Sequence, residues 1–311
     1  MLASNQEPRN RTESFMPQSI SIDCDGIAVS ALVQRGGNDT LVVLFHGAMN
    51  REKRVIPFHM PFLSAMPDVW QISIADPVLE KFDHLPAGWY LGWSGHRLWD
   101  QLSAAIRRFA SERGCARRIY VGGSSGGFAT LLYAALDPGS TAIAYNPQTD
   151  LENHVYPKAA ARYFNSAWNG RTDGLPLRLA DRYQDLTSNR IVLLQSSGDI
   201  PHLRKQAMPF LSALPDPLWS RVVVDFSFEG ILGHGGSIRR ETVNRWVLAS
   251  IEARDDQDAA AAILETKHAL DLALDSPGKS VPASPRASGF AQSDMRLADQ
   301  IAARQLRKAG R

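Results

Sequence analysis

Residues Ile119 to Ala129 read Ile-Tyr-Val-Gly-Gly-Ser-Ser-Gly-Gly-Phe-Ala, and this segment is the most informative one for the fold. Strand-forming apolar residues lead into a Gly-x-Ser-x-Gly pattern, and small apolar residues typical of a helix follow. Glycine two positions before and after the serine is a steric requirement, because a tight turn there leaves no room for side chains. Such a turn predicts an exposed hydroxyl at the start of a helix, whose positive end favours a developing negative charge. We expect Ser124 to be a nucleophile, with Ser125 as the alternative.

Three other strand-like runs also end in residues that carry chemistry. The run 40–45 is followed by His46-Gly47-Ala48, the run 190–195 by Asp199, and the run 221–226 by His234. Each of these residues lies just beyond the carboxyl end of an expected strand. Ser124, Asp199 and His234 then follow one another along the chain in the order serine, aspartate, histidine, which is one of the orders found in serine hydrolases.

Together these residues resemble the α/β-hydrolase superfamily over roughly positions 20–252. The resemblance implies an α/β fold with a doubly wound, mostly parallel sheet and helices on both faces. It implies Ser124 as nucleophile, His234 as general base and acid, and Asp199 as the group that orients the imidazole. It also implies an oxyanion hole formed by the backbone N–H groups of Ala48 and Ser125.

Short motifs narrow the resemblance further. They are Gly88-Trp89-Tyr90-Leu91-Gly92, Asn146-Pro147-Gln148-Thr149-Asp150 and Pro209-Phe210-Leu211. They are similar to a bacterial branch found in capsular-polysaccharide clusters and in an accessory secretion system that modifies glycosylated adhesins. That likeness implies acyl transfer on sugars.

Other residues compete for roles at the site. Asp150 follows another strand-like run, 142–145, and is an alternative acid. His202 lies three residues after Asp199, so it is either a second imidazole at the site or a loop histidine at the pocket rim. Asp225 and Glu229 precede His234 closely and are interpreted as strand-end and turn residues.

Two loops are expected to shape the substrate pocket. The segment 80–97 is rich in aromatic residues and contains three glycines, so Trp89 and Tyr90 are candidate substrate-binding residues; alternatively, these rings only pack the loop on the core. His46 and His202 are the other two candidate substrate-binding residues. The segment 151–189 separates two expected strands and is interpreted as a partial lid that limits the entry of water. A cationic cluster at Arg51, Lys53 and Arg54 is either an anion site or a solvated surface.

Composition bounds the function. The chain has 311 residues, 44% of them hydrophobic, and a formal net charge of +2, so neither nucleic acid nor another charge-driven partner is indicated. Two cysteines and scattered histidines show no metal-ligand spacing, and we expect no metal and no cofactor. The first twenty residues lack an apolar h-region and no long apolar run occurs. We therefore expect a cytoplasmic protein without a membrane span.

The chain is expected to comprise a disordered lead (1–18), a hydrolase domain (19–254) and an Ala-rich helix with a flexible basic tail (255–311). A pair of N-terminal strands, covering 20–30 and the region of Val33, is expected to have its turn near residues 36–39. A strand is expected at 69–75, and helices at 99–112, 128–136, 202–214, 237–254 and 259–274.

Three functions fit the sequence. The first is an esterase-like serine hydrolase that cleaves a small-molecule or carbohydrate acyl ester through an acyl-enzyme. The second is an O-acyltransferase that uses the same three residues to pass the acyl group to a carbohydrate or glycoprotein. The third is a non-catalytic binding partner built on the same fold. The sequence does not specify the acyl chain or the oligomeric state.

Overall fold

The computed structural model describes residues 17–64, 66, 68–186, 188–253 and 258–274. The expected N-terminal lead lies outside these residues except for positions 17 and 18, and β1 already begins at Gln18. The expected flexible tail after residue 274 also lies outside them.

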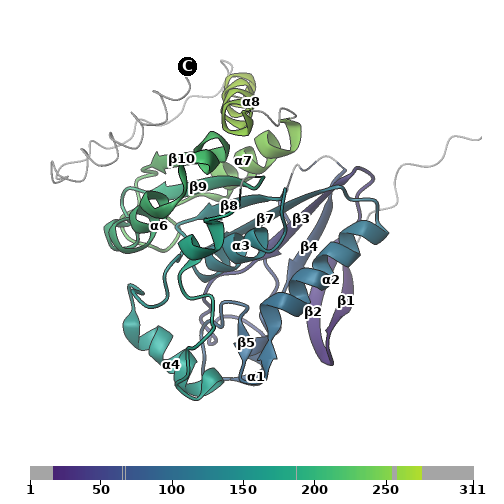
Figure 1. Cartoon of the computed structure of the whole chain (residues 1–311). Coiled ribbons are helices and arrows are strands. Elements are labelled where there is room, and N and C mark those ends of the chain that lie inside the picture. Colours follow the sequence, from purple (N-terminus) through teal and green to yellow (C-terminus); the bar gives the residue numbers. More distant parts are fainter. Residues whose placement is uncertain (1–16, 65, 67, 187, 254–257, 275–311) are drawn as a thin grey trace, which may run out of the picture.

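A mostly parallel sheet forms the centre of the described chain (Figure 1). Its strands lie in the order β1 (Gln18–Cys24), β2 (Ile27–Gln34), β4 (Trp70–Ile74), β3 (Thr40–Phe45), β7 (Arg117–Gly123), β8 (Thr141–Tyr145), β9 (Arg190–Ser196) and β10 (Val222–Ser227). β1 and β2 are antiparallel to their neighbours, whereas the run from β4 to β10 is parallel. The carboxyl ends of these six strands therefore meet at one edge, where ligands bind in open α/β sheets.

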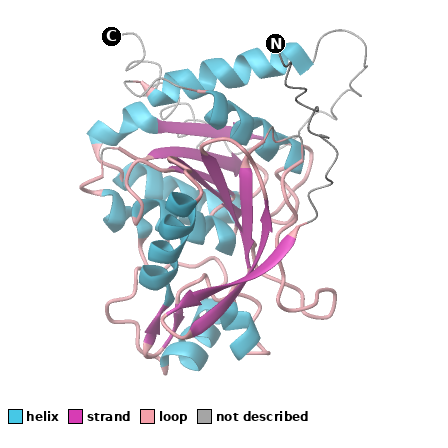
Figure 2. Cartoon of the chain, turned by 90° about the vertical axis from the view of Figure 1, so that its right-hand side faces the viewer, coloured by secondary structure: helices cyan, strands magenta, loops and turns pink. Residues whose placement is uncertain are grey.

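Helices cover both faces of the sheet (Figure 2). The α-helices are α1 (Pro77–Lys81), α2 (Leu98–Glu112), α3 (Ser125–Ala135), α4 (Pro157–Trp168), α5 (Ile200–His202), α6 (Met208–Ala213), α7 (Arg240–Glu252) and α8 (Ala259–Leu274). Two 3₁₀ turns, η1 (Leu179–Tyr183) and η3 (Asp216–Arg221), a π-helical turn, η2 (Leu203–Ala207), and the small hairpin β5 (Gly92–Trp93) and β6 (His96–Arg97) complete the elements.

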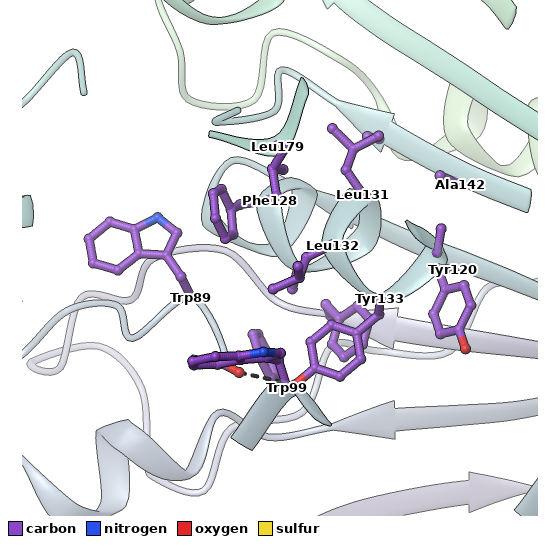
Figure 3. Close-up of a cluster of buried hydrophobic side chains, with 14 of the residues drawn as sticks. Trp89, Trp99, Tyr120, Phe128, Leu131, Leu132, Tyr133, Ala142 and Leu179 are labelled. Carbon is purple, nitrogen blue, oxygen red and sulfur yellow. Dashed lines mark hydrogen bonds between the residues drawn. The ribbon is translucent and has the colours of Figure 1, made fainter. Parts of the chain in front are cut away.

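Two buried clusters hold the layers together. Leu41, Val43 and Phe45 of β3 face one cluster with α2 and α3, whereas Val42 and Leu44 face the other with α7 and α8. This alternation follows from the two-residue period of a strand, and the continuous apolar run follows from burial on both faces. Figure 3 shows the first cluster, in which α3 places its apolar side chains between the sheet and the loop of Trp89.

The helix at 259–274 is confirmed, and the helices predicted at 99–112 and 237–254 are found as α2 and α7 with shifted ends. α8 packs on the core, with Ala259 and Ile263 fully buried. The N-terminal turn was predicted too late in the chain: the β1–β2 hairpin turns at Asp25 and Gly26, which have φ of 56° and 81°. An Asp-Gly pair adopts these positive φ values readily. Among the described residues, no helix combines the length and apolar character needed to cross a bilayer.

Candidate active site

Ser124 lies between the last residue of β7 and the first residue of α3, on a strained turn. Its φ of 56° and ψ of −120° are unfavourable for a residue with a Cβ atom, so surrounding contacts must hold it there. Its N–H donates to the carbonyl oxygen of Tyr145 at 3.2 Å, and its own carbonyl oxygen accepts from Phe128 and Gln148, both at 3.1 Å. The side chain is partly exposed, whereas Ser125 is buried. Of the two serines, Ser124 is therefore the more accessible.

Glycines allow this turn because other atoms occupy the space where their side chains would lie. A Cβ at Gly123 would lie 2.0 Å from the ring of Tyr145, and one at Gly126 would lie 2.5 Å from the carbonyl oxygen of Phe45. Gly47, in the loop after β3, also lies near the turn, since a Cβ there would lie 3.0 Å from the carbonyl oxygen of Gly123 and 3.5 Å from the Cβ of Ser124. The loop after β3 and the serine turn are therefore in contact.

Asp199 follows β9 and its carboxylate lies between two imidazoles. Its Oδ2 accepts from Nδ1 of His234 at 2.6 Å, and its Oδ1 accepts from Nδ1 of His202 at 3.0 Å. The two rings stack with centroids 3.8 Å apart and an interplanar angle of 19°. Burial of Asp199 alone would raise its pKa, but these two hydrogen bonds hold that pKa well below its usual range. The carboxylate is thus an anion that fixes the orientation of His234.

The loop that carries His234 is anchored by a hydrogen-bonded asparagine. Asn146 accepts from the N–H of Ser196 at 2.8 Å and donates to Oγ of Ser237 at 2.8 Å. Ser237 in turn donates to the carbonyl oxygen of His234 at 3.3 Å. Asn146, which follows β8, therefore connects the last residue of β9 with the loop that follows β10. The sequence alone assigned no role to Asn146. Its position directly after a predicted strand is the signal that could have identified it.

Gln148 is a further residue that sequence reasoning left without a role. Its Nε2 lies 3.3 Å from Oγ of Ser124, and Oε1 accepts from the indole N–H of Trp89. Among the described residues, hydrogen bonds connect Ser124 to Gln148 and His234 to Asp199, and none joins Oγ of Ser124 to the imidazole of His234. Trp89, expected to contact substrate, is 2% exposed and acts here as a donor to Gln148.

His46 and Tyr90, for which the sequence predicts contact with substrate, are buried in this structure and bind backbone groups. Nδ1 of His46 donates to the carbonyl oxygen of Gly47 at 2.8 Å, and its Nε2 accepts from the N–H of Asp76 at 3.2 Å. The hydroxyl of Tyr90 donates to Ile74 and accepts from the N–H of His46. Burial lowers the pKa of His46 to about 4, so the ring is neutral and both nitrogens are occupied internally.

The hydrogen bond from His46 to the carbonyl oxygen of Gly47 sets the orientation of the peptide group between Gly47 and Ala48. In a trans peptide the C=O and the following N–H point in opposite directions. Because His46 holds the carbonyl of Gly47, the N–H of Ala48 must point the other way. Ala48 itself is exposed. The N–H of Ser125 is the second candidate donor, since the first N–H groups of a helix have no partner within it.

The alternative acid residues lie in other environments. Asp150 accepts from the backbone N–H groups of Glu152 and Asn153, so it caps a turn. Asp225 accepts from the indole N–H of Trp246, and Glu229 accepts from Thr242. His202 is fully buried beneath His234, which excludes a place at the pocket rim.

The three residues of the cationic cluster, Arg51, Lys53 and Arg54, lie in different environments. Arg51 donates to the carbonyl oxygens of Leu79, Phe82 and Leu85, so it stabilises a loop and is not free for an anion. Lys53 and Arg54 are exposed.

In the part of the chain that the structure describes, Asp199, His202 and His234 form a group that could hold a metal ion, with one possible ligand atom from each lying within 4.8 Å of the others. The geometry fits hydrogen bonding better. The two rings are nearly parallel and each Nδ1 addresses a different carboxylate oxygen. Two nitrogens that share one ion would have to converge on a single point.

No family model and no curated protein matches the chain. Solved structures do resemble it. MPT51 of Mycobacterium tuberculosis is 16% identical, with a TM-score of 0.52 over 80% of this chain and 99% of that one. An acylaminoacyl peptidase of Pyrococcus horikoshii is 17% identical, with a TM-score of 0.52 over 76% of this chain and 41% of that one.

A capsule O-acetyltransferase of Neisseria meningitidis serogroup A is 15% identical, with a TM-score of 0.51 over 74% of this chain and 95% of that one. The chain spans about two fifths of the length of the peptidase. At these identities the likeness concerns the fold alone. The chain has the α/β-hydrolase fold, as its motifs predicted.

Proposed function

We propose that this chain is a serine hydrolase that cleaves an acyl ester with Ser124 as nucleophile, His234 as general base and acid, and Asp199 as the orienting carboxylate. The observation that carries the proposal is the 2.6 Å contact between Asp199 and His234 at the sheet edge where the strained turn presents Ser124. Hydrolase-fold enzymes among the structural neighbours are consistent with it.

The proposed reaction follows from the protons in place. Because Nδ1 of His234 donates to Asp199, its Nε2 carries the lone pair that accepts the Ser124 proton. As that proton leaves, Oγ forms a bond to the ester carbon and the carbonyl oxygen becomes an anion. The N–H groups of Ala48 and Ser125 bind this oxyanion. His234 then protonates the departing alcohol, and a water molecule activated by the same imidazole releases the acid.

O-acyl transfer to a hydroxyl-rich acceptor is the second candidate, supported by a pocket of about 440 Å³. Five of its seven lining residues have polar or charged side chains, namely Asp150, Glu152, Asn153, His154 and Lys205, and the other two are Pro157 and Pro209. The ring centroid of His154 lies 5.6 Å from that of Trp89, whose indole N–H donates to Gln148, the residue in contact with Ser124. Carboxylate, amide and ammonium groups of this kind bind sugar hydroxyls.

Turnover of short aryl acyl esters tests the proposal. The wild type is expected to release the phenol, and Ser124→Ala and His234→Ala are each expected to lose at least about a thousandfold in kcat. Equal turnover by wild type and Ser124→Ala would overturn the proposal. Adding an oligosaccharide separates the two candidates: acyl groups recovered on the sugar indicate transfer, and free acid alone indicates hydrolysis.

A further inference from the structure

One buried side chain reaches the proposed nucleophile without being part of the proposed serine–histidine–aspartate set. Gln148 is 4% exposed, and its Nε2 lies 3.3 Å from Oγ of Ser124. Its backbone N–H separately donates to the carbonyl oxygen of Ser124 at 3.1 Å. The backbone contact already anchors the segment, so the side-chain contact is additional.

Trp89 determines which end of the Gln148 amide faces the serine. An indole N–H can only donate, so the atom it contacts must be the amide oxygen. The NH₂ group is then the end directed at Oγ. The orientation of this amide is set by chemistry and leaves a hydrogen-bond donor aimed at the proposed nucleophile.

Trp89 is itself held rigidly. Its backbone has a φ of 51°, and the N–H groups of its neighbours Gly88 and Tyr90 both donate to Oδ2 of Asp76, at 3.0 and 3.3 Å. Its ring packs on Tyr163 with centroids 5.2 Å apart. Asp76 thus fixes the loop, the loop fixes the indole, and the indole fixes the amide.

We propose that Gln148 is a further catalytic residue, which donates a hydrogen bond to Ser124 Oγ in a direction set by Trp89. A hydroxyl oxygen has one proton and two lone pairs. With one lone pair held by the amide, fewer orientations remain for the hydroxyl proton that the proposed reaction passes to His234. The inference rests on the proposed hydrolase function.

The amide also acts when the acyl-enzyme breaks down. Water adds to the ester carbon and gives its proton to His234. The Oγ–C bond then breaks, Oγ takes the electron pair, and the proton returns to Oγ from the imidazole. The Gln148 N–H stabilises the charge that develops on Oγ and keeps its own proton throughout. A donor placed in advance where charge develops is worth more than one in water.

The rate of labelling by a fluorophosphonate measures nucleophile activation without a known substrate. Gln148→Met keeps the length of the side chain and removes the donor, so the full chain is expected to label about 10- to 100-fold more slowly than wild type. Trp89→Phe keeps a ring and removes the indole N–H. It is expected to slow labelling in the same direction by a smaller factor.

Two further measurements separate catalysis from a purely structural role. Gln71→Met removes a buried amide that binds only the backbone of Leu63, and it is expected to lower the unfolding temperature without changing the labelling rate of folded protein. In the double variant of Trp89 and Gln148, the Trp89 change should add nothing, because it acts through the amide. If Gln148→Met does not fold, the Trp89→Phe rate alone decides the matter.

Equal labelling rates for wild type and Gln148→Met would overturn the inference and leave the hydrolase proposal intact. Additive effects in the double variant would overturn the part assigned to Trp89. A folded wild type that does not label at all would overturn the proposed function, and the inference with it.

Discussion

At the scale of single residues, Asp199 is the most constrained group of the proposed site. It is 1% exposed and each carboxylate oxygen accepts from a different imidazole. Oδ1 also accepts from the backbone N–H of His202 at 3.5 Å, so loss of the imidazole donor weakens the hydrogen bonding of this oxygen and loosens the carboxylate. His202 therefore positions Asp199, and through it His234.

His202→Phe preserves an aromatic ring against His234 and removes the Nδ1 donor. We expect it to lower the free energy of unfolding by about 1–3 kcal/mol and ester turnover by about tenfold or more. His202→Asn keeps an N–H donor near the position of Nδ1 and should recover part of both losses. Urea unfolding and kcat on an aryl ester measure the two effects. Wild-type values for His202→Phe would contradict this role.

The limits of sequence reasoning are also clearest at this scale. The strand-end pattern identified the loops of Ser124, Asp199 and His234, because parallel strands bring their carboxyl ends together. It did not reveal which way each side chain faces. His46 and Tyr90 occupy the expected loops but turn inward to bind backbone groups. Gln148 was missed because its contact with Ser124 joins the ends of different strands.

At the scale of elements, the turn between β7 and α3 depends on the absence of side chains. A Cβ at Gly126 would meet the carbonyl oxygens of Phe45 and His46 at 2.5 and 2.7 Å. Those atoms belong to the backbone of β3 and the residue after it, so they cannot move aside cheaply. The helix approaches the strand this closely only because the residue is glycine.

Gly126→Ala is expected to destabilise the protein by about 3 kcal/mol or more, because one methyl group must displace two backbone carbonyls. Gly235→Ala is the matched control, since a Cβ there meets nothing within 4 Å and its φ is not positive. Thermal unfolding of both variants tests the expectation. An unfolding temperature for Gly126→Ala close to that of Gly235→Ala would show that β3 can move away.

Element boundaries were less predictable than element types. The helix predicted at 128–136 begins earlier, at Ser125, because the serine turn feeds directly into it. The helix predicted at 202–214 is divided into α5, η2 and α6. Gln206, within the π-helical turn, accepts from the N–H groups of Thr149 and Asp150. This tertiary contact leaves no trace in the periodicity of the segment.

At the scale of the whole molecule, the α/β fold was predictable because strand-like and helix-like segments alternate and each strand run has a clear apolar core. The division at residues 19–254 and the lid at 151–189 stay predictions. The pH dependence of stability, in contrast, depends on the pKa values of buried groups, and no sequence pattern gives these values. His46 is the clearest case, since burial lowers its pKa from 6.5 to about 4.

A lowered histidine pKa gives stability that is present above pH 6.5 and lost as the pH falls toward 4, because the unfolded chain binds the proton first. The stability advantage of wild type over His46→Gln should therefore shrink by about 2 kcal/mol between pH 7 and pH 4.5. Urea unfolding of both proteins across that range measures it, and other titrating groups cancel in the difference. An advantage that stays constant with pH would contradict a neutral, buried His46.

The most direct test of the central claim is to label the full chain with a fluorophosphonate and locate the probe by mass spectrometry. We expect the probe on Ser124, with labelling lost in Ser124→Ala and retained in Ser125→Ala. A probe found on Ser125, or a folded wild type that resists labelling, would contradict the assignment of Ser124 as an activated nucleophile.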